Sequence, residues 1–126
     1  MGGRSLAMHK EILIIDDQPG IRMLLTDVFE NEGYKVTTAA DGEEAIKKLY
    51  ENRYDAVLVD YKLPIISGVE ILRKLEQDNI NVPIIVMSGL ADEIEKELSE
   101  FQLVKEVLGK PFDIQQLVGN VKKIIG

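Results

Sequence analysis

The 126-residue sequence contains no cysteine, no tryptophan and a single histidine, His9. Without cysteine the chain can form no disulfide, use no thiol nucleophile and offer no thiolate to a metal. A lone histidine also excludes metal sites built from histidine clusters and argues against a histidine-based catalytic triad. No apolar run approaches the roughly 20 residues of a membrane span, and no secretory hydrophobic segment stands near the N-terminus. We therefore expect a cytoplasmic protein with no membrane partner.

Positive charge is also scarce, because 15 basic residues face 22 acidic ones and the net charge is −7. This balance argues against direct contact with nucleic acid. The apolar fraction of 45% and the charged fraction of 29% are typical of a globular domain, and the length suits one domain. Residues 1–7 are expected to be an expression leader ahead of a natural start at Met8, so the predicted domain covers 8–126.

Five short apolar runs alternate with helical patterns along the chain. The predicted strands are Glu11–Asp16, Lys35–Ala39, Ala56–Asp60, Pro83–Met87 and Val104–Leu108. The predicted helices begin at Pro19, with apolar positions that recur through Phe29, and continue with Gly42–Asn52, Gly68–Asp78, Asp92–Phe101 and a last one with apolar positions from Ile114 to Ile125. Capping-box spacing marks helix starts at Asp41, Ser67, Asp92 and Asp113. This alternation predicts right-handed βαβ units and a parallel sheet covered on both faces.

The composition of the strands also predicts their order. Runs at 12–15, 56–59 and 84–87 are apolar without interruption, as expected of central strands that are buried on both faces. The strands at 36–39 and 104–108 carry polar residues, which is typical of edges. Three central and two edge strands fit the order 2-1-3-4-5 of the flavodoxin-like (βα)5 fold, a doubly wound parallel sheet. Ligands of such folds bind at the carboxyl ends of the strands beside the point where the chain reverses direction.

Polar residues gather where the predicted strands end. Asp16 and Asp17 close the first strand, Asp60 closes the third, Ser88 follows the fourth and Lys110 follows the fifth. Three carboxylates in one crevice repel each other, and Mg²⁺, which prefers oxygen ligands, would relieve that repulsion. A hydroxyl and an ammonium group complete a set suited to phosphoryl transfer onto a carboxylate nucleophile.

Each of these features also has an ordinary structural explanation. An Asp pair before a helix serves as a cap, a strand-closing Asp supplies loop polarity, and Ser-Gly and Lys-Pro pairs are common in turns. Their coincidence at four strand ends favours the functional interpretation.

Four motifs resemble those of bacterial two-component response regulator receiver domains, in order and in spacing. They are Ile-Leu-Ile-Ile-Asp-Asp at 12–17, Asp-x-x-Leu-Pro-x-x-x-Gly at 60–68, Met-Ser-Gly at 87–89 and Lys-Pro-Phe at 110–112. The resemblance runs from about Lys10 to Ile125. The stretch at 16–22, with Val-Phe at 28–29 and Glu-Gly-Tyr at 32–34, is most similar to single-domain regulators that relay phosphoryl groups in bacterial sporulation.

The resemblance implies a role for each site residue. Asp60 would be the phosphoacceptor, taking the phosphoryl group from a sensor histidine kinase or histidine phosphotransferase. Asp17 and Asp60 would coordinate Mg²⁺ directly, Asp16 would do so mostly through water, and the main-chain carbonyl of Lys62 would complete the metal ligands. Ser88 and Lys110 would each contact a phosphoryl oxygen, and the peptide bond after Lys110 is expected to be cis. The chain would assist its own phosphorylation and slow dephosphorylation and would not be an enzyme.

Two departures from the family pattern affect the expected output. An aromatic residue usually stands three positions before the lysine, where this chain has Val107, and the usual Gly-Ala pair before the last strand is replaced by Leu103-Val104. Phosphate capture should survive because no ligand is altered. The aromatic flip that usually reports activation has no side chain to perform it here.

Alternative functions remain open from the sequence. The chain could be a complete relay regulator, or a receiver excised from a longer transcriptional regulator with an output domain. A degenerate receiver used only as an interaction module is a further alternative. A phosphatase of the haloacid dehalogenase type also uses an aspartate with Mg²⁺, but it needs Asp-x-Asp where this chain has Lys62.

Overall fold

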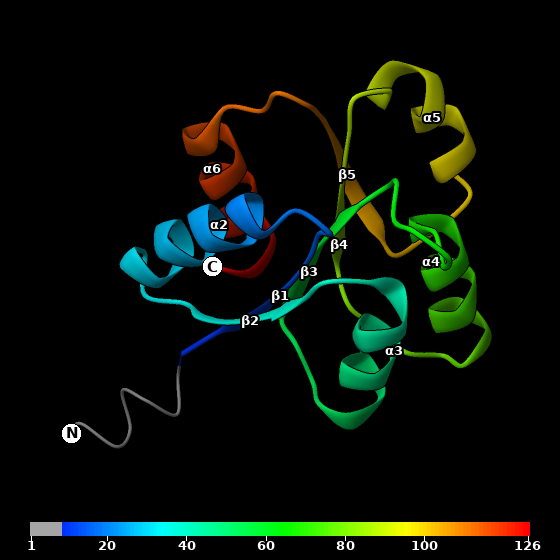
Figure 1. The fold of residues 1–126 in the computed structure, drawn as a ribbon, viewed down its shortest axis with the longest axis horizontal. Helices are drawn as coiled ribbons and strands as arrows, with labels where there is room; N and C mark the ends of the chain where they lie inside the picture. Colours follow the sequence, from blue (N-terminus) through cyan, green and yellow to red (C-terminus); the bar gives the residue numbers. More distant parts are fainter. Residues whose placement is uncertain (1–8) are drawn as a thin grey trace.

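The computed structural model describes residues 9–126, and its elements alternate along the chain (Figure 1). The expected leader at 1–7 and the start at Met8 lie outside the described residues. The strands are β1 (Glu11–Ile15), β2 (Lys35–Ala39), β3 (Ala56–Asp60), β4 (Ile84–Ser88) and β5 (Val104–Gly109). The helices are α2 (Pro19–Asn31), α3 (Gly42–Glu51), α4 (Gly68–Gln77), α5 (Ala91–Leu98) and α6 (Ile114–Ile125).

The five strands form one parallel sheet in the order β2-β1-β3-β4-β5, which confirms the predicted fold. All residues of β3 and β4 are buried, and so is β1 after its first residue, whereas the edge strands β2 and β5 keep partly exposed positions. Uninterrupted apolar runs thus lie in the middle of the sheet because helices cover them on both faces. The ladder between β4 and β5 has one irregularity, because Val104 pairs with Ile84 and Glu106 pairs with Ile85.

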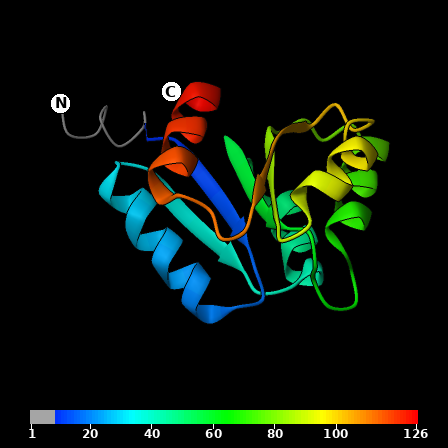
Figure 2. The same ribbon diagram turned by 90° about the horizontal axis from the view of Figure 1, so that it is seen from above.

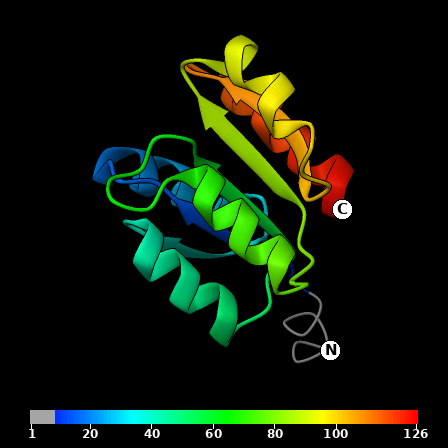
Figure 3. The ribbon, with the colours of Figure 1, turned by 90° about the vertical axis from the view of Figure 1, so that its right-hand side faces the viewer.

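Helices cover the sheet on two sides, and each side has its own apolar core. Figures 2 and 3 show α2 and α6 on one face and α3, α4 and α5 on the other. The first core holds Leu25 and Phe29 of α2 with Leu117 and Val121 of α6 against alternate strand residues. The second core packs α3, α4 and α5 against the other set of strand residues. Burial on both faces fixes the register of the strands, so their carboxyl ends line up at one edge of the sheet.

Most helix starts match the caps that the sequence predicts. Asp41 accepts a hydrogen bond from the N–H of Glu44, Ser67 forms a full capping box with Glu70, and Asp113 accepts from the second and third residues of α6. Pro19 stands in the first turn of α2, where a missing N–H is tolerated.

The prediction of a helix over Asp92–Phe101 is wrong at both ends. The helix α5 begins at Ala91, its N-cap is Leu90, and Asp92 lies in the first turn, where its charge faces the helix dipole. At its other end, the Ser99 hydroxyl donates a hydrogen bond to the carbonyl of Lys96 at 2.6 Å. This local bond competes with the helix, and Phe101 is then buried from a turn that leads into β5.

Within residues 9–126, none of the helices has the length and apolar character needed to cross a bilayer.

Candidate phosphoryl-transfer site

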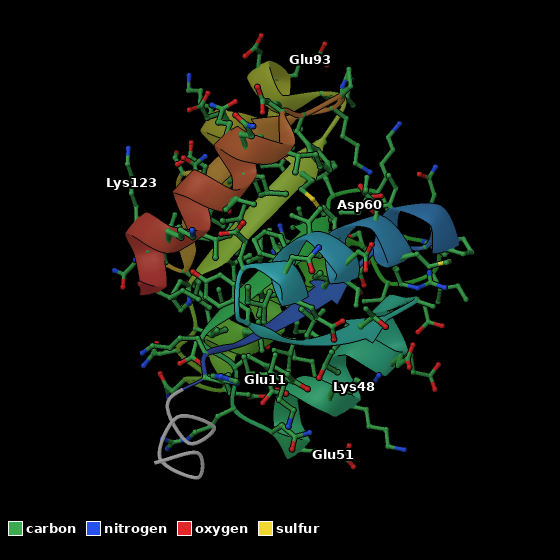
Figure 4. All side chains as sticks on the ribbon, turned by 90° about the vertical axis from the view of Figure 1, so that its left-hand side faces the viewer. Glu11, Lys48, Glu51, Asp60, Glu93 and Lys123 are labelled. Carbon is green, nitrogen blue, oxygen red and sulfur yellow. The ribbon has the colours of Figure 1, made fainter. Side chains whose placement is uncertain are left out.

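Three carboxylates meet at the carboxyl edge of the sheet. Carboxylate oxygens of Asp16, Asp17 and Asp60 all lie within 4.8 Å of one another. They converge because β1 and β3 are neighbours in register, with Ile15 beside Val59, so the residues that follow emerge side by side. Figure 4 places Asp60 near the start of α2, far from Glu11 and Glu51 at the opposite end of the sheet. Asp16 and Asp60 are buried, while Asp17 is exposed.

Lys110 reaches two of these acids from the loop after β5. Its Nζ lies 3.1 Å from Oδ2 of Asp60 and 3.4 Å from Oδ2 of Asp16. The peptide bond between Lys110 and Pro111 is cis, as predicted. The Lys110 main chain is anchored to the neighbouring strand β4, because its N–H donates to the carbonyl of Ser88 at 2.8 Å. The Lys110 ammonium is therefore held between two acids of the predicted metal site.

Ser88 and Lys62 flank Asp60 from two directions. Asp60 pairs with Met87 in the sheet, so Ser88 ends β4 one residue beyond it. The buried Ser88 hydroxyl oxygen accepts a hydrogen bond from the N–H of Leu90 at 2.9 Å, which leaves its proton free to donate. The N–H of Lys62 donates to Oδ1 of Asp60 at 3.3 Å. The structure thus brings all six predicted site residues together at the carboxyl edge of the sheet.

Steric crowding explains why the motif at 60–68 has a glycine at position 68. Gly68 is the buried first residue of α4 and its N–H donates to the carbonyl of Tyr61 at 3.2 Å. A Cβ at this position would lie 3.2 Å from the carbonyl oxygen of Asp60 and from the Cα of Tyr61. Any larger residue would push α4 away from the backbone that carries Asp60, because those neighbours are main-chain atoms.

The burial of the site perturbs its ionisation. Burial raises the pKa of Asp60 above its ordinary value, and the hydrogen bond and charge of Lys110 only partly oppose this effect. The pKa of Lys110 is also raised, since the hydrogen bond to Asp60 and the charges of Asp16 and Asp60 outweigh the opposing effect of burial. The ionised form of Asp60 is therefore destabilised when no metal is bound.

Replacing Asp60 by Asn is accordingly expected to stabilise the metal-free protein at neutral pH. An unfolded Asp titrates near pH 3.9. Because the pKa of folded Asp60 is higher, its contribution to stability is full at more acidic pH and is lost as pH rises through the folded pKa. The variant should melt a few degrees above the wild type at pH 7 in EDTA, and the two curves should converge near pH 4. Equal melting temperatures at pH 7 would contradict the assigned ionisation.

The donor set fits a hard divalent cation. The three acids offer only oxygen atoms as ligands. Asp16 and Asp60 are buried, and Asp17 is exposed to solvent. A bound metal would offset the destabilised negative charge of Asp60. Oδ2 of Asp60 is paired with Lys110, whereas Oδ1 accepts, from the residues at 9–126, only the 3.3 Å bond from the Lys62 amide. An oxygen of Asp60 is thus free for a metal even with the lysine in place.

Two residues that sequence reasoning missed support the acidic loop. The Nη1 of Arg22 donates to the main-chain carbonyl of Asp16 at 2.7 Å, and the N–H of Gln18 donates to Oδ1 of Asp16 at 2.9 Å. A single arginine on an amphipathic helix is typical of a solvated face. The sequence signal for this contact is the position of Arg22 five residues after Asp17. That spacing predicts a contact only once the direction of α2 relative to the loop is known.

Residues 12–122 match the family model for the response regulator receiver domain. The chain is 39% identical to sporulation initiation phosphotransferase F of Bacillus subtilis, over 94% of this chain and 95% of that protein. It is 35% identical to the alkaline phosphatase synthesis transcriptional regulatory protein PhoP of the same organism. That match spans 94% of this chain and 49% of PhoP.

Solved structures give the same result. The response regulator TrrA of Thermotoga maritima, in complex with Mg²⁺ and beryllofluoride, superposes with a TM-score of 0.81 at 36% identity, covering 91% of this chain and 98% of that one. The receiver domain of a sensor histidine kinase from Pseudomonas aeruginosa has a magnesium ion coordinated in its active site cleft. It superposes with a TM-score of 0.83 at 30% identity, over 94% and 98% of the two chains.

Proposed function

The chain belongs to the family of response regulator receiver domains, and from this premise we propose that Asp60 accepts a phosphoryl group in a Mg²⁺-dependent step. The donor is a sensor histidine kinase or a histidine phosphotransferase. The observation that carries the proposal is the convergence of Asp60 with two further acids and Lys110 at the end of β3. The receiver domain is proposed to span residues 8–126.

The transfer is an in-line displacement at phosphorus. A carboxylate oxygen of Asp60 forms a new O–P bond while the P–N bond to the donor histidine breaks. The imidazole leaves with the bonding electron pair and is stabilised as a neutral or protonated ring. Asp60 fits the nucleophile because its carboxylate lies beside those of Asp16 and Asp17 and contacts Lys110, while Ser88 ends the neighbouring strand β4.

The proposed metal ligands are Asp16, Asp17, Asp60 and the main-chain carbonyl of Lys62. When bound there, Mg²⁺ supplies positive charge that offsets the repulsion between the carboxylate and the phosphoryl oxygens. Lys110 contributes a second positive charge by exchanging its contact with Asp60 for a phosphoryl oxygen, which forms a charge-assisted hydrogen bond. Ser88 donates its free hydroxyl proton to another phosphoryl oxygen.

This chemistry makes the chain a switch that does not turn over a separate substrate. It assists its own phosphorylation and the slow loss of its phosphate. A kinase or phosphotransferase would dock over the crevice, where Leu24 of α2 and Leu90 after β4 have exposed side chains. A downstream output domain or protein would read the phosphorylated state.

The protein context has two forms among the relatives. One is the relay regulator that the chain matches over 95% of its length, and the other is a transcriptional regulator of which the chain covers about half. Either context uses the same crevice and the same phosphoacceptor.

Removal of the metal tests the proposed function. Incubation with a labelled phosphohistidine kinase and Mg²⁺ is expected to transfer label to the chain in an acid-stable, alkali-labile form, as an acyl phosphate requires. Excess EDTA should suppress labelling, and added Mg²⁺ should restore it. Labelling at the same rate in EDTA would exclude a metal-dependent step.

Activation is expected to move the loop after Ser88 and the helix α5 with little change in the rotamer of Val107. Val107 is β-branched and therefore stiff at χ1, and it packs against the core on the α5 side of the sheet. Tyr61, which directly follows Asp60, donates a hydrogen bond to Oε1 of Glu97 on α5 at 3.4 Å and so links the site to this helix. Chemical shifts and χ1 couplings in the free and beryllofluoride-bound forms measure both effects. A χ1 flip of Val107 on activation would contradict this expectation.

A further inference from the structure

We propose that Arg22 is a positioning residue that fixes the peptide between Asp16 and Asp17, and so holds the Asp17 carboxylate in place for the metal. The proposal rests on the function assigned to this crevice. The Nη1 of Arg22 donates to the Asp16 carbonyl at 2.7 Å, and that carbonyl belongs to the peptide unit that joins Asp16 to Asp17. Arg22 lies in α2, where its own N–H bonds to the carbonyl of Gln18 at 3.1 Å.

The two acids of the loop are held very differently. Asp16 is fixed by its N–H, which donates to the carbonyl of Ala39 at 3.1 Å, by the Gln18 amide at Oδ1 and by Lys110 at Oδ2. Within the described residues, 9–126, the carboxylate of Asp17 has no hydrogen bond or ion pair, and the residue is exposed. The position of Asp17 therefore depends on the orientation of the peptide plane before it, which is the group that Arg22 holds.

Arg22 also has an electrostatic effect on Glu44, which lies in the first turn of α3. The N–H of Ala40 and the ammonium of Lys48 lower the pKa of Glu44, and the charge of Arg22 adds to this effect. Glu44 is tied to the backbone after β2 by its bond from the Ala40 N–H at 2.7 Å. Among the described residues the ion pair of Glu44 is with Lys48, so the hydrogen bond from Arg22 to the Asp16 carbonyl is the contact that carries the proposal. A planar group with several donors suits this role better than an ammonium.

The electrostatic effect of Arg22 on a bound cation has the opposite sign to the positioning effect. A positive charge near the metal site repels Mg²⁺, so removing the charge alone would tighten metal binding. Removing the hydrogen bond from Arg22 to the Asp16 carbonyl would free the peptide before Asp17 and weaken metal binding. The direction of the change in Mg²⁺ affinity therefore separates the two roles.

The test compares Arg22→Met and Arg22→Lys with Arg53→Met, which removes the same charge at the opposite, exposed end of the molecule. The readouts are the Mg²⁺ dissociation constant from calorimetry, the amide hydrogen exchange of Asp17 and Gln18 without metal, and the thermal unfolding curve. Arg22→Met is expected to raise the dissociation constant about tenfold, as the loss of one charge-assisted hydrogen bond implies. Amide exchange at Gln18 should accelerate in Arg22→Met. The dissociation constant and exchange rate of Arg22→Lys should lie between those of the wild type and Arg22→Met, and Arg53→Met should behave like the wild type.

Unchanged or tighter Mg²⁺ binding by Arg22→Met would overturn the proposal, and so would unchanged exchange at Gln18. Weaker binding that follows only from a general loss of stability, with exchange accelerated throughout the sheet, would also overturn it. If Arg22→Met does not fold, Arg22→Lys decides by the same readouts. Failure of the wild type to bind Mg²⁺ would instead contradict the function assigned to the crevice, and exchange at Gln18 would still decide the role of Arg22.

Discussion

Replacing Asp17 by Asn is expected to slow phosphoryl transfer by orders of magnitude while leaving the fold intact. The exposed carboxylate has no hydrogen bond within the described residues, so its loss should change stability little. The same carboxylate is proposed as a direct Mg²⁺ ligand, and metal stabilisation of developing charge is worth several kcal/mol, or about 10³-fold in rate. Single-turnover labelling over a range of Mg²⁺ concentrations measures both the affinity and the limiting rate.

Asp27→Asn is the matched control for Asp17→Asn, because it removes the same charge from an exposed position on α2. It should keep the wild-type rate and the wild-type Mg²⁺ dependence. A rate for Asp17→Asn within a few-fold of the control would mean that Asp17 is not a metal ligand.

Replacing Asp60 by Asn is expected to abolish acyl phosphate formation completely. The amide keeps the shape of the side chain but has no anionic oxygen to attack phosphorus. Asp16 is an unsuitable substitute because it is fully buried and held on three sides, and Asp17 is expected to be occupied by the metal. The variant should still fold, and in EDTA it should be more stable than the wild type at neutral pH, since the buried charge is gone.

Phosphotransfer from a labelled histidine kinase to Asp60→Asn, with Mg²⁺ present, measures this loss. Retained far-UV circular dichroism and a raised melting temperature show that an absence of label is not caused by unfolding. Residual labelling at more than a trace level would place the phosphoacceptor elsewhere.

The strand order could be predicted from the sequence because burial leaves a direct mark on composition. The central strands at 12–15, 56–59 and 84–87 have no polar residue, and the edge strands do. Once the order is known, the convergence of acids after β1 and β3 follows from topology alone. That is why the Asp pair at 16–17 and the distant Asp60 could be predicted from the sequence to share one site.

Features that depend on competing local contacts could not be predicted. The capping spacing at Asp92 matches that of true helix starts, yet α5 begins one residue earlier. Ile65 has a positive φ of 68° although it is β-branched and exposed, because it is the central residue of a γ-turn in which the N–H of Ile66 donates to the carbonyl of Pro64 at 2.7 Å. The brace from Arg22 to Asp16 needs the angle between α2 and the loop before it, which no periodicity reveals.

Mapping the phosphorylated residue tests the account most directly. The wild type is incubated with a small-molecule phosphodonor and Mg²⁺, digested, and analysed by mass spectrometry, with a parallel sample in EDTA. We expect a gain of one phosphoryl mass on the peptide that contains Asp60, assigned to that residue by fragmentation, and no gain in EDTA. A phosphoryl group on any other residue, or equal modification of Asp60 without metal, would contradict it.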